Sequence, residues 1–412
     1  MRRNPNVVLS VVAAAYGLSS MGDQMAMVVL TLRLHDQGRS GAVISALVIA
    51  SVLPLVVVGP LAGPLLDRVE SGRLVVAVTG FQAVVALGLA LTTDVVATIV
   101  LLVLLGAGLA VVSPTLQLLV PEIVGDADTT RGFARLETFR SVGNVAGPAL
   151  AGLLVAGVGH RAVLLGNAGS FAVVAGVFLV LRIRREPAAG DARLGWLGQV
   201  RQGVDVLGGD RLLRVAIPAL ATAVVFTAMM NVARVFYIRD DLGASDAGYG
   251  WLVTAHTLGM LLAAAFLATR VPLTWQPRVL AGAGAMMGAA LFVSSTVPVF
   301  AFAFAAFVIT GVANALQNLA IRNLIHARVP RETRGRAFAS SSAALNGANL
   351  TGTALAGPVA TSLGGAGALQ LAGAGTLLAS LAAAPTLLRH RLIDPTAHPI
   401  SPTTRTTNPT GD

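Results

Sequence analysis

One nine-residue stretch recurs in this chain with six of its nine residues unchanged. Asn144-Val-Ala-Gly-Pro-Ala-Leu-Ala-Gly152 reappears 205 residues later as Asn349-Leu-Thr-Gly-Thr-Ala-Leu-Ala-Gly357. At the same offset the chain repeats Gly106 as Gly311, Ala110 as Ala315, Arg131 as Arg336, Phe133 as Phe338 and Ala134 as Ala339. A single match can arise by chance in Ala- and Leu-rich sequence, but several at an offset of half the chain indicate an internal repeat. The repeat predicts two similar halves.

The composition indicates an integral membrane protein. Of 412 residues, 55% are hydrophobic and only 12% are charged, whereas a soluble domain has about 25% charged residues. The chain contains no cysteine, which excludes disulfide scaffolds, thiolate nucleophiles and cysteine-ligated metal sites. We therefore expect an all-α polytopic membrane protein.

Twelve stretches are apolar over the roughly 20 residues that a membrane-spanning helix needs. Six lie in each half, which predicts two pseudo-symmetric six-helix bundles, a plan that one large class of transporters shares. The expected spans are Val7–Leu32, Ala42–Leu66, Leu74–Leu91, Val95–Val120, Phe139–Val158, Ala162–Leu181, Val215–Ile238, Tyr249–Leu267, Val279–Ser295, Val299–Ile325, Ala337–Leu363 and Ala368–Leu388.

The basic residues predict the orientation. There is no lysine, so the formal net charge of +10 comes from 29 arginines against 19 acidic residues. With the N-terminus inside, 24 arginines fall on the cytoplasmic side, 4 in outer loops and one, Arg234, inside a span, as the positive-inside rule demands. We expect a multi-pass protein of the cell membrane with both termini cytoplasmic. Arginines in short gaps between apolar runs make no basic face for nucleic acid.

The division into domains follows from the polar gaps. We expect a bundle over residues 1–182, a cytoplasmic linker over 183–214, a second bundle over 215–391 and a disordered cytoplasmic tail over 392–412. Within the linker, apolar residues at helical spacing predict an amphipathic helix on the inner membrane surface, with a plain linker as the alternative. These residues are Trp196, Leu197, Val200, Val204 and Leu207.

Four motifs carry a resemblance to a known family. They are Gly63-Pro-Leu-Leu-Asp67-Arg68 followed by Arg73, Ser19-Ser-Met-Gly22-Asp23, Gly203-Val-Asp-Val-Leu through Asp210-Arg-Leu-Leu-Arg214, and Gly143-Asn-Val-Ala-Gly147-Pro148-Ala-Leu-Ala-Gly152. The chain resembles the major facilitator superfamily, and within it the branch of drug–proton antiporters and siderophore exporters. The resemblance implies a monomeric secondary transporter with protons and a small molecule as partners, and with no cofactor or metal.

The chain also departs from the family's patterns. Val69–Gly72 stands between Arg68 and Arg73, and the first glycine of the antiporter motif is replaced by Ala134. The span-four arginine of many proton-coupled members is replaced by Leu102. The fold assignment does not depend on these positions, whereas proton coupling by the family's usual residues does.

Asp23 is the only acidic residue well inside an expected span. A carboxylate there costs about 2.5–3.5 kcal/mol on the insertion scale and normally faces a cavity or a partner. Because an apolar surrounding favours the neutral form of a carboxyl group, Asp23 is a candidate for proton coupling or substrate binding. The alternative is a packing role, with the carboxyl bonded to a neighbouring backbone group or to Gln24.

Other polar residues are candidates for the cavity lining. Asn314, Gln317 and Asn318 share one helix face by their spacing, and the resemblance places that span beside the central cavity. Hydrogen bonding between helices is the alternative. Asn231, Arg234 and His256 are weaker candidates.

Two groups are candidates for gating. Asp67 beside Arg68 can cap a helix N-terminus and hold an inner gate closed together with Gly63 and Arg73; the alternative is a solvated loop charge. Small residues allow helices to approach closely, and proline allows bending. A stripe of such residues consists of Gly143, Gly147, Pro148 and Gly152. It can form a tight contact with a helix of the other half, or serve general packing.

The sequence does not indicate an enzyme. The motifs of zinc proteases, of serine hydrolases and of phosphate-binding loops are absent. We expect proton-coupled efflux of a lipophilic or amphipathic small molecule by alternating access. The alternatives are an importer or facilitator of a small polar nutrient, and a membrane sensor that does not transport.

Overall fold

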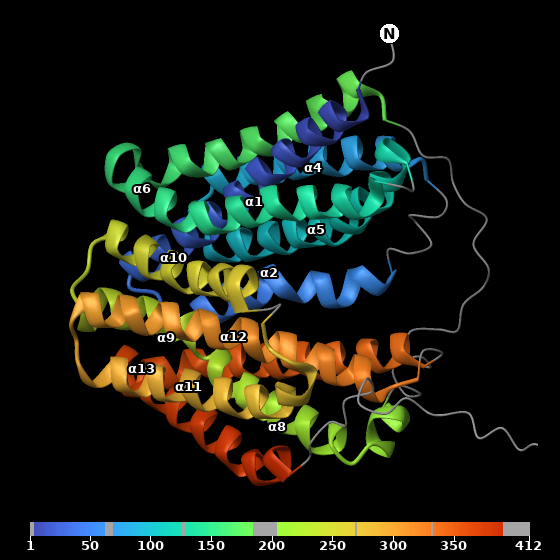
Figure 1. Cartoon of the computed structure of the whole chain (residues 1–412). Helices are drawn as coiled ribbons and strands as arrows, with labels where there is room; N and C mark the ends of the chain where they lie inside the picture. The colour runs from blue at the N-terminus through green and yellow to red at the C-terminus, as the bar shows by residue number, and fades with distance from the viewer. Residues whose placement is uncertain are drawn as a thin grey trace, which may run out of the picture.

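The computed structural model describes residues 4–61, 69–125, 128–183, 204–267, 270–330 and 333–389. Long helices account for nearly all of these residues and run side by side (Figure 1). The first half contains α1 (Pro5–Asp36), α2 (Gly41–Leu61), α4 (Ser71–Leu91), α5 (Val95–Val124) and α6 (Thr129–Leu181). The second half contains α8 (Leu213–Ala228), α9 (Met230–Phe236), η2 (Tyr237–Asp241), α10 (Asp246–Leu262), η3 (Ala263–Leu267), η4 (Leu273–Trp275), α11 (Gln276–Thr296), α12 (Phe300–Arg328) and α13 (Arg334–Arg389).

The expected spans coincide with helices throughout the described residues, which confirms the all-α fold. Ten helices there are long and apolar enough to cross a membrane. The number is ten because α6 and α13 each include two expected spans. Each of the two contains a glycine in the left-handed region, Gly159 with φ 79° and Gly364 with φ 71°. A side chain is disfavoured at such a φ, and the chain reverses at both points.

These left-handed glycines also show the internal repeat in three dimensions. Gly159 and Gly364 are 205 residues apart, and so are Gly38 and Gly243, which have φ values of 67° and 61°. The repeat thus extends from matching sequence to matching turns.

Contacts between helices also repeat at the offset of 205 residues. A methyl group added to Gly106 on α5 would touch the carbonyl of Ser51 on α2, and one added to Gly311 on α12 would touch the carbonyl of His256 on α10. Ser51 and His256 are again 205 residues apart. Equivalent helices therefore pack in the same way in the two halves.

Several helices begin at a capping side chain. The Asp94 carboxylate accepts a hydrogen bond of 2.7 Å from the backbone N–H of Ala97, at the start of α5. The Ser245 hydroxyl accepts one of 3.3 Å from the N–H of Gly248, at the start of α10. Such caps satisfy helix N–H groups that have no partner within the helix.

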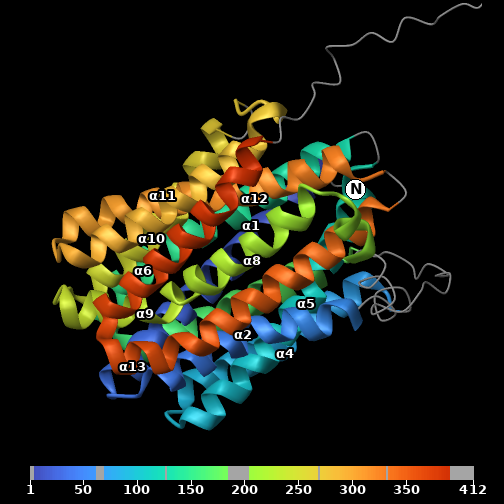
Figure 2. The same cartoon turned by 90° about the horizontal axis from the view of Figure 1, so that it is seen from below.

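Two pairs of helices join the halves: α6 packs against α10, and α2 packs against α13 (Figures 1 and 2). We call the end with Gly38, Gly159, Gly243 and Gly364 the turn end. The other end, where α1 begins and α13 ends, is the arginine-rich end; it includes Arg131, Arg182, Arg214, Arg328 and Arg389.

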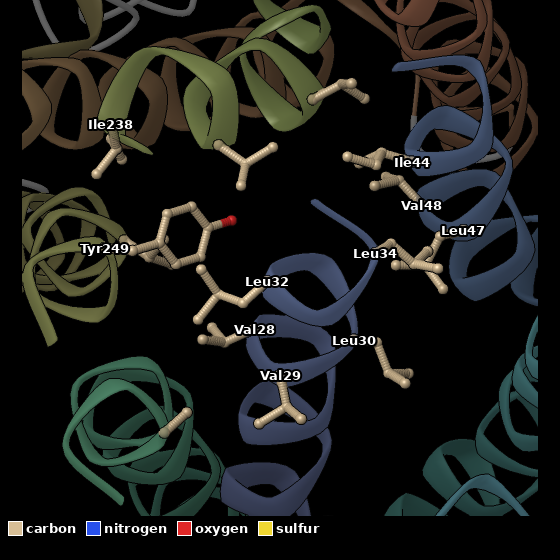
Figure 3. Close-up of a cluster of buried hydrophobic side chains, with 14 of the residues drawn as sticks. Val28, Val29, Leu30, Leu32, Leu34, Ile44, Leu47, Val48, Ile238 and Tyr249 are labelled. Carbon is tan, nitrogen blue, oxygen red and sulfur yellow. The ribbon is translucent and has the colours of Figure 1, made fainter. Parts of the chain in front are cut away.

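A single apolar core crosses from one half to the other near the turn end (Figure 3). Leu32 and Ile44 of the first half lie in it with Ile238 and Tyr249 of the second, and all four are fully buried. Opening this contact to water would cost about 25 cal/mol for each Å² of apolar surface exposed. The core therefore stabilises contact between the halves at the turn end.

Candidate functional site

A cleft of about 510 Å³ lies between the halves toward the arginine-rich end. Its wall in the first half is formed by α6, and its wall in the second half by α10, η3 and α12. The volume is in the range of small-molecule sites. Polar and charged groups from both halves line it: Glu137, Arg140 and Asn144 on one side, Thr257, Asn318 and Arg322 on the other.

Two arginines of the cleft differ in their partners. Glu137 and Arg140, one turn apart on α6, form a bidentate ion pair in which Arg140 Nε lies 2.9 Å from Glu137 Oε2 and Nη2 donates to Oε1. This arrangement leaves Nη1 of Arg140 unused. Arg322 is exposed and forms no ion pair within the ranges that the structure describes. The cleft therefore has one more positive charge than negative.

Asp23 lies in the middle of α1 and is half-buried. Its side chain interacts with Asn167 of α6, which is buried and sits against Gly22. The polar partner is thus Asn167 rather than Gln24, whose Cβ instead lies beside Gly147. The sequence analysis did not select Asn167, because a lone amide in a long apolar run indicates helix packing as readily as a site.

A second polar group lies two turns before Asp23. The Tyr16 hydroxyl forms a hydrogen bond with Ser113 of α5. Tyr16 lies within electrostatic range of Asp23, and also of Glu137 and Arg140 in the cleft. Tyr16 is therefore near both Asp23 and two charged residues of the cleft.

The polar residues predicted on α12 do not act as one face. Asn318 donates to the backbone carbonyl of Asn314 at 2.9 Å and lines the cleft. Gln317 is buried and faces Gly284 and Ser380 inside the second half. Of the predicted face, the structure thus brings Asn318 to the cleft and turns Gln317 away from it.

The other candidates of the second half lie in the interior. His256 Nδ1 is 3.1 Å from the Thr310 hydroxyl, a contact between α10 and α12. Arg234 lies within electrostatic range of His256, and its Nε is buried without a hydrogen-bond partner in the described structure. Asn231 is half-buried on α9. None of the three lines the cleft.

Of the candidates for the inner gate, Gly63, Asp67 and Arg68 lie outside the described residues. Arg73 lies within them, and its Nε is 2.9 Å from Glu70 Oε2. Because its side chain is 76% exposed, this ion pair contributes little to stability. The gating role of Asp67 stays a prediction.

The glycine–proline stripe of α6 has two different neighbours. A methyl group at Gly143 or Gly147 would meet backbone atoms of α1, in the same half. One at Gly152 would overlap the carbonyl of Asp246 on α10, in the other half. Pro148 also belongs to this contact, since its carbonyl lies against Gly250. Pro148 and Gly152 thus make the expected contact between the halves, whereas Gly143 and Gly147 pack within the first half.

Charged residues reinforce the turn end. Arg239 Nη2 is 3.3 Å from Asp36 Oδ1 of the other half, and Arg239 Nη1 is 3.1 Å from Asp246 Oδ1. His35 Nε2 lies 3.0 Å from Asp240 Oδ1, again across the halves. The sequence analysis did not select these residues, since their partners are about 200 positions away. Together with the apolar core, they close the turn end.

Tyr249 gives a way to test this closure. Its hydroxyl is fully buried in the core between the halves and has no hydrogen-bond partner among the described residues (Figure 3). Because an unpaired buried hydroxyl costs about 1–3 kcal/mol, Tyr249→Phe is expected to favour the closed turn end. The chain has no cysteine, so a single Leu32→Cys can report opening. We expect its labelling by an impermeant maleimide to slow about fivefold or more in the Tyr249→Phe background; equal or faster labelling would contradict the closure.

The chain matches the family model described as Major Facilitator Superfamily over residues 12–230 and 215–409. This chain belongs to that superfamily. The first match extends past the first half to residue 230, and the second match begins at residue 215, near the start of α8. The superfamily assignment makes this chain a multi-pass membrane transporter rather than an enzyme.

Relatives agree with this assignment. The transporter is 25% identical over 366 residues to the uncharacterized MFS-type transporter YfiS of Bacillus subtilis (strain 168), covering 85% of this chain and 86% of YfiS. The fold of the nucleoside transporter NupG matches with a TM-score of 0.77 at 12% identity, over 94% of this chain and 100% of that one. A peptide transporter POT variant in complex with alafosfalin matches with a TM-score of 0.72 at 14% identity, over 92% and 94%.

Proposed function

We propose that this transporter exports a lipophilic or amphipathic small molecule in exchange for protons, by alternating access. The observation that carries the proposal is the form of the interface between the halves, which is closed at the turn end and hollowed into a polar cleft toward the other. In alternating access the two halves rock about a site between them. The cleft would take up substrate in the present state and release it after the turn end has opened.

The proposed proton carrier is Asp23. Its carboxyl group lies within a membrane-spanning helix, where ionisation is costly, and it is half-buried beside a polar partner, Asn167. Tyr16, which lies within electrostatic range of Asp23 and of the cleft residues Glu137 and Arg140, is the proposed link between substrate and proton. The motifs Ser19–Asp23 and Gly143–Gly152 favour the drug–proton antiporter branch of the superfamily.

Proton movement in proteoliposomes tests this proposal. A pH-sensitive dye inside the vesicles is followed while amphipathic fluorescent compounds of negative, zero and positive charge are added outside. Antiport predicts that protons leave as substrate enters. Protons entering together with a substrate would favour the importer, and no transport of any compound would favour the sensor.

The proposed orientation places the arginine-rich end in the cytoplasm, because the positive-inside rule favours arginine there. Reporter tags inserted after Asp412 and between Pro187 and Arg193 should both be cytoplasmic. A matched tag at Gly38, in the turn between α1 and α2, should be outside. A cytoplasmic signal from Gly38, or an outside signal from either other tag, would contradict the orientation. We further propose that the protein is a monomer of the cell membrane.

A further inference from the structure

The positive charge of the cleft has no counterpart in the symmetry of the fold. At the 205-residue offset Arg140 corresponds to Leu345, and Arg322 corresponds to Gln117. Glu137, which pairs with Arg140, corresponds to Ser342. The internal repeat therefore does not account for these charges, and what they share is the cleft that they line.

Arg140 and Arg322 belong to the arginines that indicate the orientation, and they also line the cleft. Arg140 and Arg322 line one cleft from opposite walls, α6 in the first half and α12 in the second. A group that binds both would therefore contact both halves at once. Guanidinium groups recognise carboxylate, sulfonate and phosphate groups through charge-assisted hydrogen bonds. Nη1 of Arg140 and the whole guanidinium of Arg322 are available for this within the described structure.

The rest of the wall is apolar. Met260 and Leu261 of α10 and Leu316 and Leu319 of α12 face the same cleft. Side chains of this kind bind the hydrocarbon or aromatic part of a ligand. One cleft thus offers two positive groups beside an apolar surface.

We propose that the cleft binds amphipathic organic anions, with the anionic group between Arg140 and Arg322 and the apolar part against α10 and α12. This inference rests on the proposed function, since it names the substrate class of the same cleft. Glu137 orients Arg140 through the bidentate pair and is a positioning residue. A carboxylate or sulfonate in solution and the phosphate of an anionic lipid share the chemistry that the two arginines recognise.

Two fluorescent probes separate charge from shape. Anilinonaphthalene sulfonate is an amphipathic anion, and phenylnaphthylamine has the same aromatic body without the sulfonate. Binding of each is measured on the full-length protein in nanodiscs of neutral lipid, with empty nanodiscs as the blank. We expect saturable binding of the sulfonate and at least tenfold weaker binding of the amine, as the loss of a charged hydrogen bond implies.

Variants locate the site. Arg322→Gln should weaken sulfonate binding about tenfold or more and leave binding of the amine unchanged, while Arg322→Lys should restore part of the affinity. Arg389→Gln is the matched control, because it removes the same charge from an exposed position outside the cleft. Equal affinity in wild type and Arg322→Gln, or equal loss in both glutamine variants, would overturn the proposal.

The source of the anion is resolved by the lipid. If the lipid phosphate occupies the cleft, adding phosphatidylglycerol to the nanodiscs should weaken sulfonate binding to wild type but not to Arg322→Gln. If the ligand comes from solution, the added lipid should have no such effect. Coupling is judged separately. Sulfonate binding that depends on Arg322 without proton movement would retain the substrate class and reject antiport. Proton exchange with a neutral or cationic compound, without sulfonate binding, would retain antiport and reject the anionic substrate class.

Discussion

Asp23→Asn is expected to abolish proton-driven transport while leaving exchange of substrate down its own gradient. The amide resembles a permanently protonated carboxyl group in size and charge, so it cannot release a proton after the conformational change. Exchange needs only the conformational change and should continue. Both activities are measured on one reconstituted sample, with and without a pH gradient, and uphill transport should fall to the level of empty liposomes.

Asp23→Glu is the matched variant, because it keeps an ionisable group on the same turn of α1 and should retain part of the uphill transport. A packing role for Asp23 predicts a different pattern. Asn would keep most hydrogen bonds with Asn167, and both activities would survive. Full gradient-driven transport by Asp23→Asn would rule out Asp23 as an essential proton carrier.

The helices could be predicted from sequence because a bilayer leaves the backbone few choices. A chain that crosses it must satisfy every N–H and C=O internally, so each apolar run becomes a helix. The reversal points followed from the same runs: Gly159 lies between the expected spans ending at Val158 and beginning at Ala162, and Gly364 follows Leu363. Local sequence therefore determined the elements and the order in which they are connected.

The site was less predictable because it forms where the halves meet. Arg239 of η2 and Asp36 of α1 are 203 residues apart and pair only because the two halves pack together. Polarity within a span indicated Asn318 and Gln317 together. In the folded protein Asn318 lines the cleft, whereas Gln317 is buried inside the second half. Arginines near span ends were interpreted as signals of orientation. The cleft emerges only from the packing that sets Arg140 of α6 and Arg322 of α12 on opposite walls.

Closure of the turn end depends on backbone contact at two equivalent places. Gly152 of α6 lies against Asp246 of α10, and Gly357 of α13 lies against Gly41 of α2. Both pairs are related by the 205-residue offset. No side chain fits at either position in the present state, because a methyl group would overlap backbone atoms that cannot move independently of their helices.

Gly152→Val is therefore expected to hold the turn end open and to reduce transport to below about a tenth of wild type, since an overlap in a packed contact costs about 1–3 kcal/mol or more. Gly357→Val should do the same, while Gly157→Val should be near wild type, because no atom lies within 4 Å of a methyl group at that exposed position on α6. Transport is measured in proteoliposomes, and opening by maleimide labelling of Leu32→Cys, which should become faster in the first two variants. Variants at Gly152 and Gly357 that label and transport like the Gly157 control would show that the turn end opens and closes without this contact. Normal membrane abundance is expected for all three, since the overlap exists only in the state closed at the turn end.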